Sequence, residues 1–152
     1  MTRPTDEGSD NLQGPLAERL RSHGLRPTRQ RMALSSMLFE GRDRHVTAEL
    51  LHDEARALGF DLSLATVYNT LHQFTEAGLM RQVVVDGDKT YFDTNVSDHH
   101  HFFHEETRHL SDIPGGGIRV EGLPPAPDGA KVARVDVIVR LKGGYARPAG
   151  SK

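Results

Sequence analysis

Residues 63–94 read SLATVYNTLHQFTEAGLMRQVVVDGDKTYFDT, and this stretch decides the fold. Its first half carries apolar residues on one face of a helix, at Leu64, Val67, Leu71 and Phe74. Ser63 is a favourable N-cap, and Gly78 stands just after the periodic segment, where a glycine commonly ends a helix. These signals predict a helix from residue 64 to residue 77.

Two strand-like runs follow this helix, at residues 80–85 and 89–94. Between them, Asp86-Gly87-Asp88 supplies the positive φ that a tight hairpin turn requires. A helix followed directly by a two-stranded ribbon is typical of a winged helix. We therefore expect this ribbon to be the wing.

Three further helices are expected before residue 63. The first begins at Leu12 and ends at His23-Gly24, the second begins at Pro27-Thr28 and ends near Gly41, and the third runs from Thr47 to Gly59. Residues 12–94 then form one winged-helix domain. Residues 1–11 are polar and predict a disordered arm.

The rest of the chain differs in composition. A Gly-Gly-Gly run at residues 115–117 and Pro124-Pro125-Ala126-Pro127 predict a long connection before a β-branched run at residues 132–141. We expect residues 95–145 to form a small α/β domain with an antiparallel sheet, and residues 146–152 to form a flexible tail. The predicted fold class is α+β.

Composition narrows the chemistry that is available. The chain has 152 residues, no cysteine and a formal net charge of -2. Without cysteine, neither a disulfide framework nor a thiolate zinc site can form, so a metal would be held by imidazole and carboxylate alone. No apolar run approaches the length of a membrane span, and the first ten residues lack the apolar stretch of a signal peptide. We expect a cytoplasmic protein without membrane contact.

Residues 97–104 read SDHHHFFH and contain four of the nine histidines of the chain. The cluster is internal and follows a strand-like segment, whereas an expression tag would lie at a terminus. Such a density of histidines is typical of a site for a metal ion or haem iron. His99 and His101 are two residues apart, so in an extended segment their side chains lie on the same face and can share one ion.

A local basic segment points to nucleic acid. Arg19, Arg21, Arg26, Arg29 and Arg31 stand close together against a single Glu18. The helix expected from residue 64 presents polar side chains at its start, where a recognition helix meets phosphates and base edges: Ser63, Thr66, Tyr68 and Asn69. Asparagine can pair with adenine, and a tyrosine ring can lie on thymine methyl groups. These residues predict a DNA-reading surface.

Four segments together resemble the ferric uptake regulator (Fur) superfamily of dimeric metal-sensing repressors. They are Leu25-Arg-Pro-Thr-Arg-Gln-Arg31, Leu64-Ala-Thr-Val-Tyr-Asn-Thr-Leu71, Gly78-Leu79 and Asp98-His-His-His-Phe-Phe103. The resemblance covers about residues 12–142. The lack of cysteine, the triple histidine and Asn69 are more similar to the iron response regulator (Irr) branch than to Fur proper.

The resemblance implies a homodimer that binds A·T-rich palindromic operators in double-stranded DNA. It places the helix that follows Ser63 in the major groove, Arg26 toward the minor groove, and Arg29 and Arg31 near phosphates. Its regulatory metal position falls on His45, Asp93, His99, His101 and Asp112, a donor set that suits Fe(II), Mn(II) or Zn(II). That ion would clamp the two domains together. In the Irr branch the histidine cluster, here His99, His100 and His101, is associated with haem.

The chain also departs from its relatives. Most of them carry two Cys-x-x-Cys pairs for a structural zinc, and this chain has His104-Glu-Glu-Thr107 at the first pair and no equivalent of the second. We therefore expect no cysteine-ligated structural zinc. Fur itself usually has arginine where this chain has Asn69, so the base preference should differ. His23, His52 and His72 are lone histidines on expected helices, which are usually structural or exposed, and they are assigned no role.

Two other functions remain open. A PerR-like peroxide sensor would use Fe(II) at the same five positions and oxidise a ligand histidine. A metal-dependent enzyme would also suit histidine and carboxylate ligands, but no His-Glu-x-x-His motif, nucleophile elbow or glycine-rich phosphate loop is present. The preferred hypothesis is a winged-helix regulator of iron homeostasis and haem metabolism, and not an enzyme.

Overall fold

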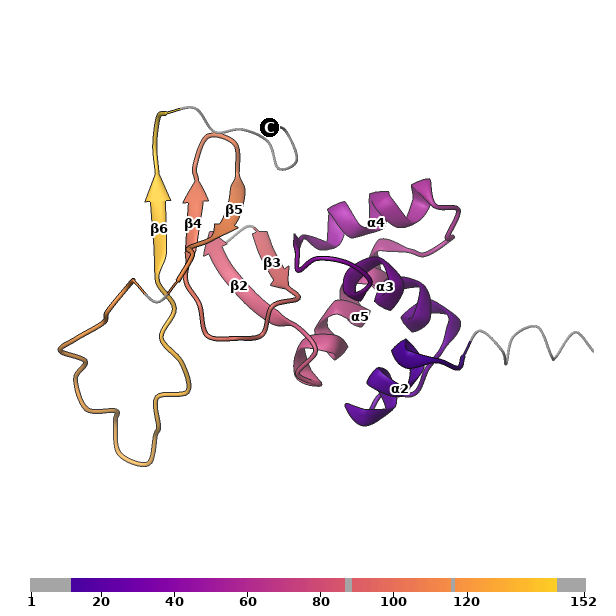
Figure 1. Ribbon diagram of the computed structural model, residues 1–152, viewed down its shortest axis with the longest axis horizontal. Coiled ribbons are helices and arrows are strands. Elements are labelled where there is room, and N and C mark those ends of the chain that lie inside the picture. Colours follow the sequence, from indigo (N-terminus) through magenta and orange to yellow (C-terminus); the bar gives the residue numbers. More distant parts are fainter. Residues whose placement is uncertain (1–11, 87–88, 116, 145–152) are drawn as a thin grey trace, which may run out of the picture. The chain divides into compact units, whose positions relative to one another are not determined.

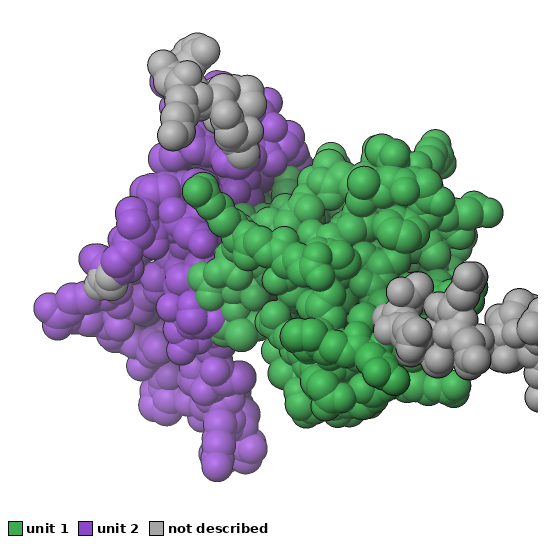
Figure 2. All heavy atoms as spheres, turned by 45° about the vertical axis from the view of Figure 1, so that its right-hand side comes forward, with its two compact units in different colours: residues 1–96 green, residues 97–152 purple. Residues whose placement is uncertain are grey.

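The computed structural model of the protein describes residues 12–86, 89–115 and 117–144. It divides into two compact units, residues 1–96 and residues 97–152, which Figure 2 colours green and purple. The expected N-terminal arm, the Gly87-Asp88 part of the hairpin turn, the middle of the triple glycine and the C-terminal tail lie outside the described residues.

The described residues of the first unit form four helices (Figure 1), with bounds α2 Pro15–Ser22, α3 Arg29–Phe39, α4 Ala48–Ala57 and α5 Leu64–Glu76. The last three begin where the sequence predicted, because Thr28, Thr47 and Ser63 each accept a hydrogen bond from the backbone N–H three residues on. The first helix begins at Pro15 rather than at Leu12. Proline is favoured in the first turn of a helix, where its missing N–H costs nothing.

The core of this unit joins the helices to the wing. Its buried apolar residues are Leu20, Leu34, Leu38, Val46, Ala48, Leu51, Val67, Leu71, Phe74, Leu79, Met80 and Phe92. Three of the four apolar residues that predicted α5 belong to this cluster, whereas Leu64 is 42% exposed at the start of the helix. The buried face of α5 therefore leaves its opposite face to solvent.

The wing is a three-stranded antiparallel sheet in the order β1-β3-β2. Its strands are β1 His45–Val46, β2 Arg81–Asp86 and β3 Lys89–Asp93. The hairpin of β2 and β3 was expected, and β1 was not. Strand β1 brings His45 directly opposite Asp93, and β2 brings Arg81 opposite Asp93 from the other side. None of the helices among the described residues is long and apolar enough to cross a bilayer.

The second unit is a three-stranded sheet in the order β5-β4-β6, with β4 His101–His104, β5 His109–Asp112 and β6 Ile138–Leu141. Strand β5 runs antiparallel to β4, while β6 runs parallel to it, so the sheet is mixed rather than purely antiparallel. The strand expected over residues 132–141 is confined to its last four residues. In the described parts of this unit, 97–115 and 117–144, no helix is present.

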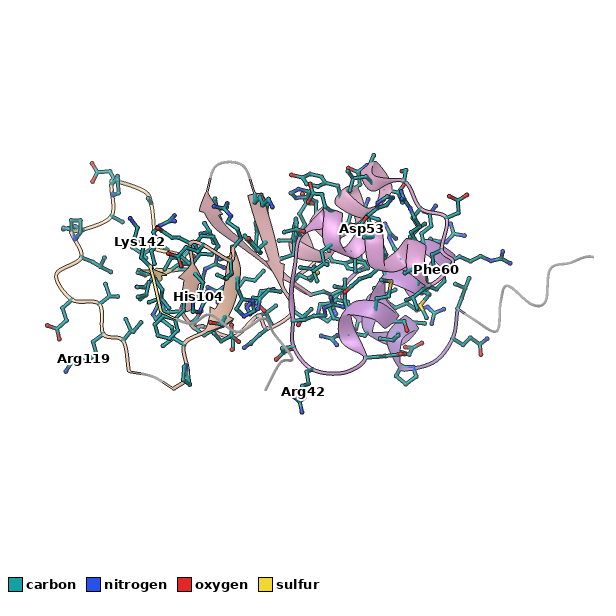
Figure 3. The ribbon with its side chains drawn as sticks, turned by 90° about the horizontal axis from the view of Figure 1, so that it is seen from above. Arg42, Asp53, Phe60, His104, Arg119 and Lys142 are labelled. Carbon is teal, nitrogen blue, oxygen red and sulfur yellow. The ribbon has the colours of Figure 1, made fainter. Side chains whose placement is uncertain are left out.

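The connection from β5 to β6 leaves the sheet and rejoins it (Figure 1), and its described residues, 113–115 and 117–137, form no helix or strand. In Figure 3, Arg119 stands on this connection. The α+β fold class predicted from the sequence is confirmed by the helical first unit, its wing and the second sheet.

Candidate metal centre and nucleic-acid interface

The first unit brings together two of the expected metal ligands, His45 and Asp93. His45 Nε2 lies 3.1 Å from Asp93 Oδ2, and the Asp93 side chain is fully buried while that of His45 is 17% exposed. The other carboxylate oxygen, Oδ1, accepts a hydrogen bond from the backbone N–H of Asn95 at 2.9 Å. Asp93 is therefore held in place by its own strand end, with one oxygen toward the imidazole.

The segment before β1 fixes the position of His45. Arg44 Nη2 reaches both carboxylate oxygens of Glu54 on α4, at 2.6 and 2.8 Å. The backbone N–H of Arg44 donates to the hydroxyl of Thr94 at 2.8 Å, and the backbone N–H of Thr94 donates to the carbonyl of Arg44 at 3.0 Å. These bonds join Arg44, the residue before His45, to Thr94, the residue after Asp93, and so hold the two strands together next to the His45–Asp93 pair.

Arg81 is a residue near this pair that sequence reasoning missed. It is 6% exposed and directly opposite Asp93 in the β2–β3 register. Directly opposed residues in an antiparallel pair point to the same face of the sheet. A buried arginine needs a negative partner, and a lone arginine in a wing strand gives no signal in the sequence until the register is known.

The second unit brings together the other three expected ligands. His99 Nε2 and His101 Nε2 lie 3.2 and 3.4 Å from the same oxygen, Oδ1 of Asp112. The two imidazole rings are 4.5 Å apart between centroids. His101 and Asp112 are also directly opposed in the β4–β5 register. Two imidazole nitrogens and a carboxylate oxygen thus converge on one point.

The hydrogen bonding of His99 suits a metal ligand. Its Nδ1 lies 2.6 Å from the carbonyl oxygen of Ser97, which can only accept, so Nδ1 carries a proton, and in a neutral imidazole the lone pair is then on Nε2. This is the arrangement by which ligating histidines are usually oriented. Asp112 is 38% exposed whereas His101 is 1% exposed, so solvent reaches the group through the carboxylate. Imidazole and carboxylate donors of this kind fit Fe(II), Mn(II) or Zn(II).

His100 makes a different hydrogen bond from its two neighbours, His99 and His101. Its Nδ1 accepts a hydrogen bond from the backbone N–H of Val137 at 3.1 Å, just before β6. In a neutral imidazole this leaves the proton on Nε2. His100 would have to give up the Val137 bond, or lose that proton, before Nε2 could ligate iron.

A cavity of about 420 Å³ lies beside His99 and His100 in the second unit. Apolar side chains from the connection between β5 and β6 contribute to its wall, and Arg134 lines it too: Ile113, Ile118, Val120, Leu123 and Val135 are the apolar members. Arg134 Nε is bonded to both carboxylate oxygens of Asp136 at 2.9 Å. The wall thus combines apolar side chains with polar ones: a carboxylate (Asp98), two imidazoles and a cation.

The N-terminal turn of α5 is exposed, as a reading surface requires. The Ser63 hydroxyl accepts from the backbone N–H of Thr66 at 3.0 Å and also bonds its hydroxyl at 2.9 Å. Tyr68 is 43% exposed, and Asn69 is exposed beside it. Ser63 therefore acts as the helix cap, while Tyr68 and Asn69 offer their side chains to solvent.

Arg31 binds other parts of the first unit rather than standing free. Its Nη1 donates to the carbonyl of Arg26 at 2.8 Å, and its Nη2 donates to the side-chain oxygen of Gln73 on α5 at 2.9 Å. A polar hollow of about 320 Å³ adjoins it and is lined in part by Thr66 and Asn69. Arg31 thus links the loop that carries Arg26 to α5.

The remaining arginines of the basic segment are dispersed. Arg29 lines a different hollow, beside Met32 and Phe60. Arg19 lies over the ring of Phe39 at 4.5 Å, and Arg21 pairs with Glu18 at 2.8 Å. Of the expected DNA-contacting residues, the structure brings Arg31, Thr66 and Asn69 to one hollow and does not bring Arg29 there.

Comparison with known proteins agrees with this architecture. The model of the ferric uptake regulator family matches residues 22–121. The ferric uptake regulation protein of Vibrio anguillarum is 34% identical over 92 residues, which is 60% of this chain and 58% of that protein. The corresponding protein of Escherichia coli K12 is 35% identical over 81 residues, or 53% and 55% of the two chains. The chain thus spans less than two thirds of the length of these relatives.

Solved structures show the same fold over a longer range. The ferric uptake regulator of Pseudomonas aeruginosa with manganese has a TM-score of 0.64 at 24% identity, over 84% of this chain and 97% of that one. The Vibrio cholerae ferric uptake regulator has a TM-score of 0.65 at 21% identity, over 83% and 98%. Because the family model spans well over half of the sequence, the chain belongs to the ferric uptake regulator family.

Proposed function

We propose that the protein is a metal-responsive, DNA-binding transcription regulator of iron homeostasis. Members of its family are DNA-binding transcription regulators and not enzymes. The observation that carries the proposal is the convergence of His99 and His101 on Asp112, in a chain whose other unit is a winged helix with an exposed α5 face. As a DNA-binding regulator it would act in the cytoplasm.

The proposed ligands of the regulatory ion are His45, Asp93, His99, His101 and Asp112. The support is that each unit holds its own ligands ready, His45 with Asp93 in one and the other three in the second. A bound divalent ion would supply two positive charges to these buried or half-buried donors. Its effect on DNA binding would be a shift between two conformational states, set by the difference in metal affinity of those states.

The proposed DNA complex has α5 in the major groove of an A·T-rich palindrome, bound by a homodimer. Tyr68 and Asn69 would contact base edges, with Ser63 and Thr66 beside the backbone. Arg26 would reach toward the minor groove and Arg29 would lie near phosphates. The two bonds of Arg31 support a role in holding Arg26 and α5 together in addition to any phosphate contact.

Fluorescence anisotropy tests this proposal. The full chain is titrated onto a labelled A·T-rich palindromic duplex and onto a scrambled duplex of the same composition, with a chelator and with Mn(II). A difference between the two duplexes that changes with Mn(II) supports the proposal. Equal affinity for both duplexes in all conditions would refute it. His99→Ala should abolish the Mn(II) effect, whereas His104→Ala on the same sheet is the matched control.

Haem sensing of the Irr type is a second proposal, which deepens the first. It is favoured by the cavity beside His99 and His100, which combines imidazoles with apolar side chains such as Ile118, Val120 and Leu123. His100 fits an axial role only if its bond with the Val137 N–H is exchanged. Haem would supply an iron centre whose axial position an imidazole can occupy.

Haem titration of the purified chain separates this proposal from peroxide sensing. A shifted Soret band that is lost in a His99→Ala/His100→Ala/His101→Ala variant supports haem sensing. No spectral change with the wild-type chain would contradict it. A gain of one oxygen atom on a ligand histidine after peroxide treatment of the Fe(II)-loaded chain would favour the PerR-like alternative.

A further inference from the structure

Three aromatic rings contact one another where α5 meets the wing. Tyr68 and His72 are four residues apart on α5, and their ring centroids are 4.6 Å apart at an interplanar angle of 60°. Phe92 of β3 completes the group, at 5.4 Å and 89° from His72 and at 6.4 Å and 88° from Tyr68. We call Tyr68, His72 and Phe92 the ring triad. All three edge-to-face contacts have favourable geometry.

Burial decreases across the ring triad from the core to the surface. Phe92 is fully buried, His72 is partly buried, and Tyr68 is 43% exposed. Side chains on a helix lean toward its N-terminus, so His72 lies over the turn that carries Tyr68. The buried Phe92 ring thus contacts His72, which in turn contacts the ring of the exposed tyrosine.

We propose that His72 is a positioning residue that holds Tyr68 in the orientation in which it reads DNA. This proposal rests on the proposed function, because it requires α5 to bind an operator. His72 was among the lone helical histidines to which the sequence gave no role. Its signal is the spacing of four residues from Tyr68, which becomes visible only when α5 is known to be the reading helix.

The physical basis is the entropy of an exposed side chain. A half-exposed tyrosine has several staggered χ1 rotamers, and binding DNA selects one of them. The rings of His72 and Phe92 against Tyr68 restrict that choice before DNA arrives, so less conformational entropy is lost on binding. Removing the His72 ring opens one side of Tyr68 without changing any atom of the tyrosine.

The neighbouring position on β3 adds a connection to the metal ligands. Phe92 belongs to the ring triad, and the next residue, Asp93, pairs with His45 in the same unit. A shift of β3 along its own axis would move both the carboxylate and the ring that supports His72. The ring triad therefore offers a route from Asp93 to the DNA-reading side chain within the first unit.

The test compares His72→Ala with His72→Phe, which keeps an aromatic ring. Each is titrated onto an A·T-rich palindromic duplex, onto the same duplex with uracil in place of thymine, and onto a scrambled duplex. Uracil lacks the C5 methyl group that a tyrosine ring can contact. Thermal unfolding of each variant confirms that it is folded.

We expect His72→Ala to weaken binding to the thymine palindrome by about 3- to 10-fold, the effect of one unrestrained side chain. It should also lose most of the preference for thymine over uracil, while binding to the scrambled duplex stays unchanged. His72→Phe should restore both properties. Unchanged palindrome affinity in His72→Ala, or an equal loss on all three duplexes, would overturn the proposal.

NMR of the free wild-type chain gives an independent measurement if His72→Ala does not fold. The chain has only three tyrosines, so Tyr68→Phe identifies the Tyr68 ring signals. Ring-current shifts from the neighbouring rings are expected for Tyr68, and random-coil positions would overturn the proposal. If the wild-type chain itself does not distinguish the palindrome from the scrambled duplex, the proposed function fails; if it does and His72 has no effect, only this inference fails.

Discussion

Arg31 donates a hydrogen bond to the backbone carbonyl of Arg26 at 2.8 Å, so the arginine at the start of α3 holds the loop that carries the other arginine. The same guanidinium bonds Gln73 on α5. Arginine can make both bonds at once because its donors form a rigid fork, which lysine lacks. The position of Arg26 relative to α5 thus depends on a side chain that the sequence assigned to phosphate contact.

Arg31→Lys keeps the charge and removes the fork. We expect it to lower the free energy of unfolding by about 1 kcal/mol, the usual contribution of a hydrogen bond, and to weaken operator binding with little change in its salt dependence. Loss of a phosphate contact would instead lower the salt slope by about one unit, but only in a charge-removing variant such as Arg31→Met. Anisotropy titrations at several salt concentrations measure both variants. Full operator affinity in Arg31→Lys would contradict the bridging role.

Asp112→Asn should weaken Mn(II) binding at least about 10-fold, since loss of a ligand costs no less than loss of a supporting contact. The reason is that Asp112 Oδ1 is the atom on which His99 and His101 converge. Isothermal titration calorimetry on the full chain measures the affinity and the number of ions bound. Asp128→Asn, at an exposed position of the connection after β5, is the control. Equal affinity in the two variants would remove Asp112 from the ligand set.

Ser63→Asp separates the capping role of this residue from its place on the DNA-facing surface. Aspartate caps helices as well as serine does, so the free energy of unfolding should change by less than about 0.5 kcal/mol. The new negative charge lies where phosphates are expected, so operator affinity should fall strongly. Ser63→Ala removes the cap without adding charge, so it should lower the free energy of unfolding by about 1 kcal/mol and change operator affinity little. Thermal unfolding and anisotropy on both variants give the comparison; tight operator binding by Ser63→Asp would place the DNA elsewhere.

Arg81→Met removes a buried cation opposite Asp93. Leaving a buried carboxylate without its opposing charge costs about 3 kcal/mol, so the variant should unfold at a lower temperature. Mn(II) supplies positive charge to the same carboxylate, and we therefore expect Mn(II) to raise the melting temperature more in the variant than in the wild type. Arg81→Lys is the control. Equal stabilisation of Arg81→Met and the wild type by Mn(II) would contradict a charge coupling between Arg81 and Asp93.

Local signals predicted the helices well, and non-local pairing was harder to predict. Thr28, Thr47 and Ser63 predict the starts of helices because each side chain caps a backbone N–H only three residues away. Strand β1 has two residues and no periodicity, and it exists because β3 offers it an edge. Strand β6 likewise depends on β4, its distant parallel neighbour. Neither partner is visible from the segment itself.

In the candidate site too, local patterns could be predicted from the sequence and contacts between distant residues could not. The resemblance to the family supplied the ligand residues, and the spacing of His99 and His101 indicated that they can share a partner. The sequence did not reveal roles for Arg81 and His72. The role of Arg81 depends on the β2–β3 register, and that of His72 depends on the contact of α5 with Phe92. The hydrogen bond from the Val137 N–H to His100 could likewise be predicted only from the β4–β6 pairing. The domain limits and the roles of the site residues stay predictions.

The parallel pairing of β4 with β6 has a consequence for how the chain matures. During synthesis β4 and β5 can form their hairpin soon after they leave the ribosome, but β6 is translated only after the whole irregular connection. Until then the backbone N–H of His101 lacks the Val137 carbonyl that it bonds in the finished fold. Strand β4, which carries the proposed metal ligand His101, therefore gains its second neighbour late, and a protease that cuts the connection would leave β6 held to β4 by noncovalent contacts alone.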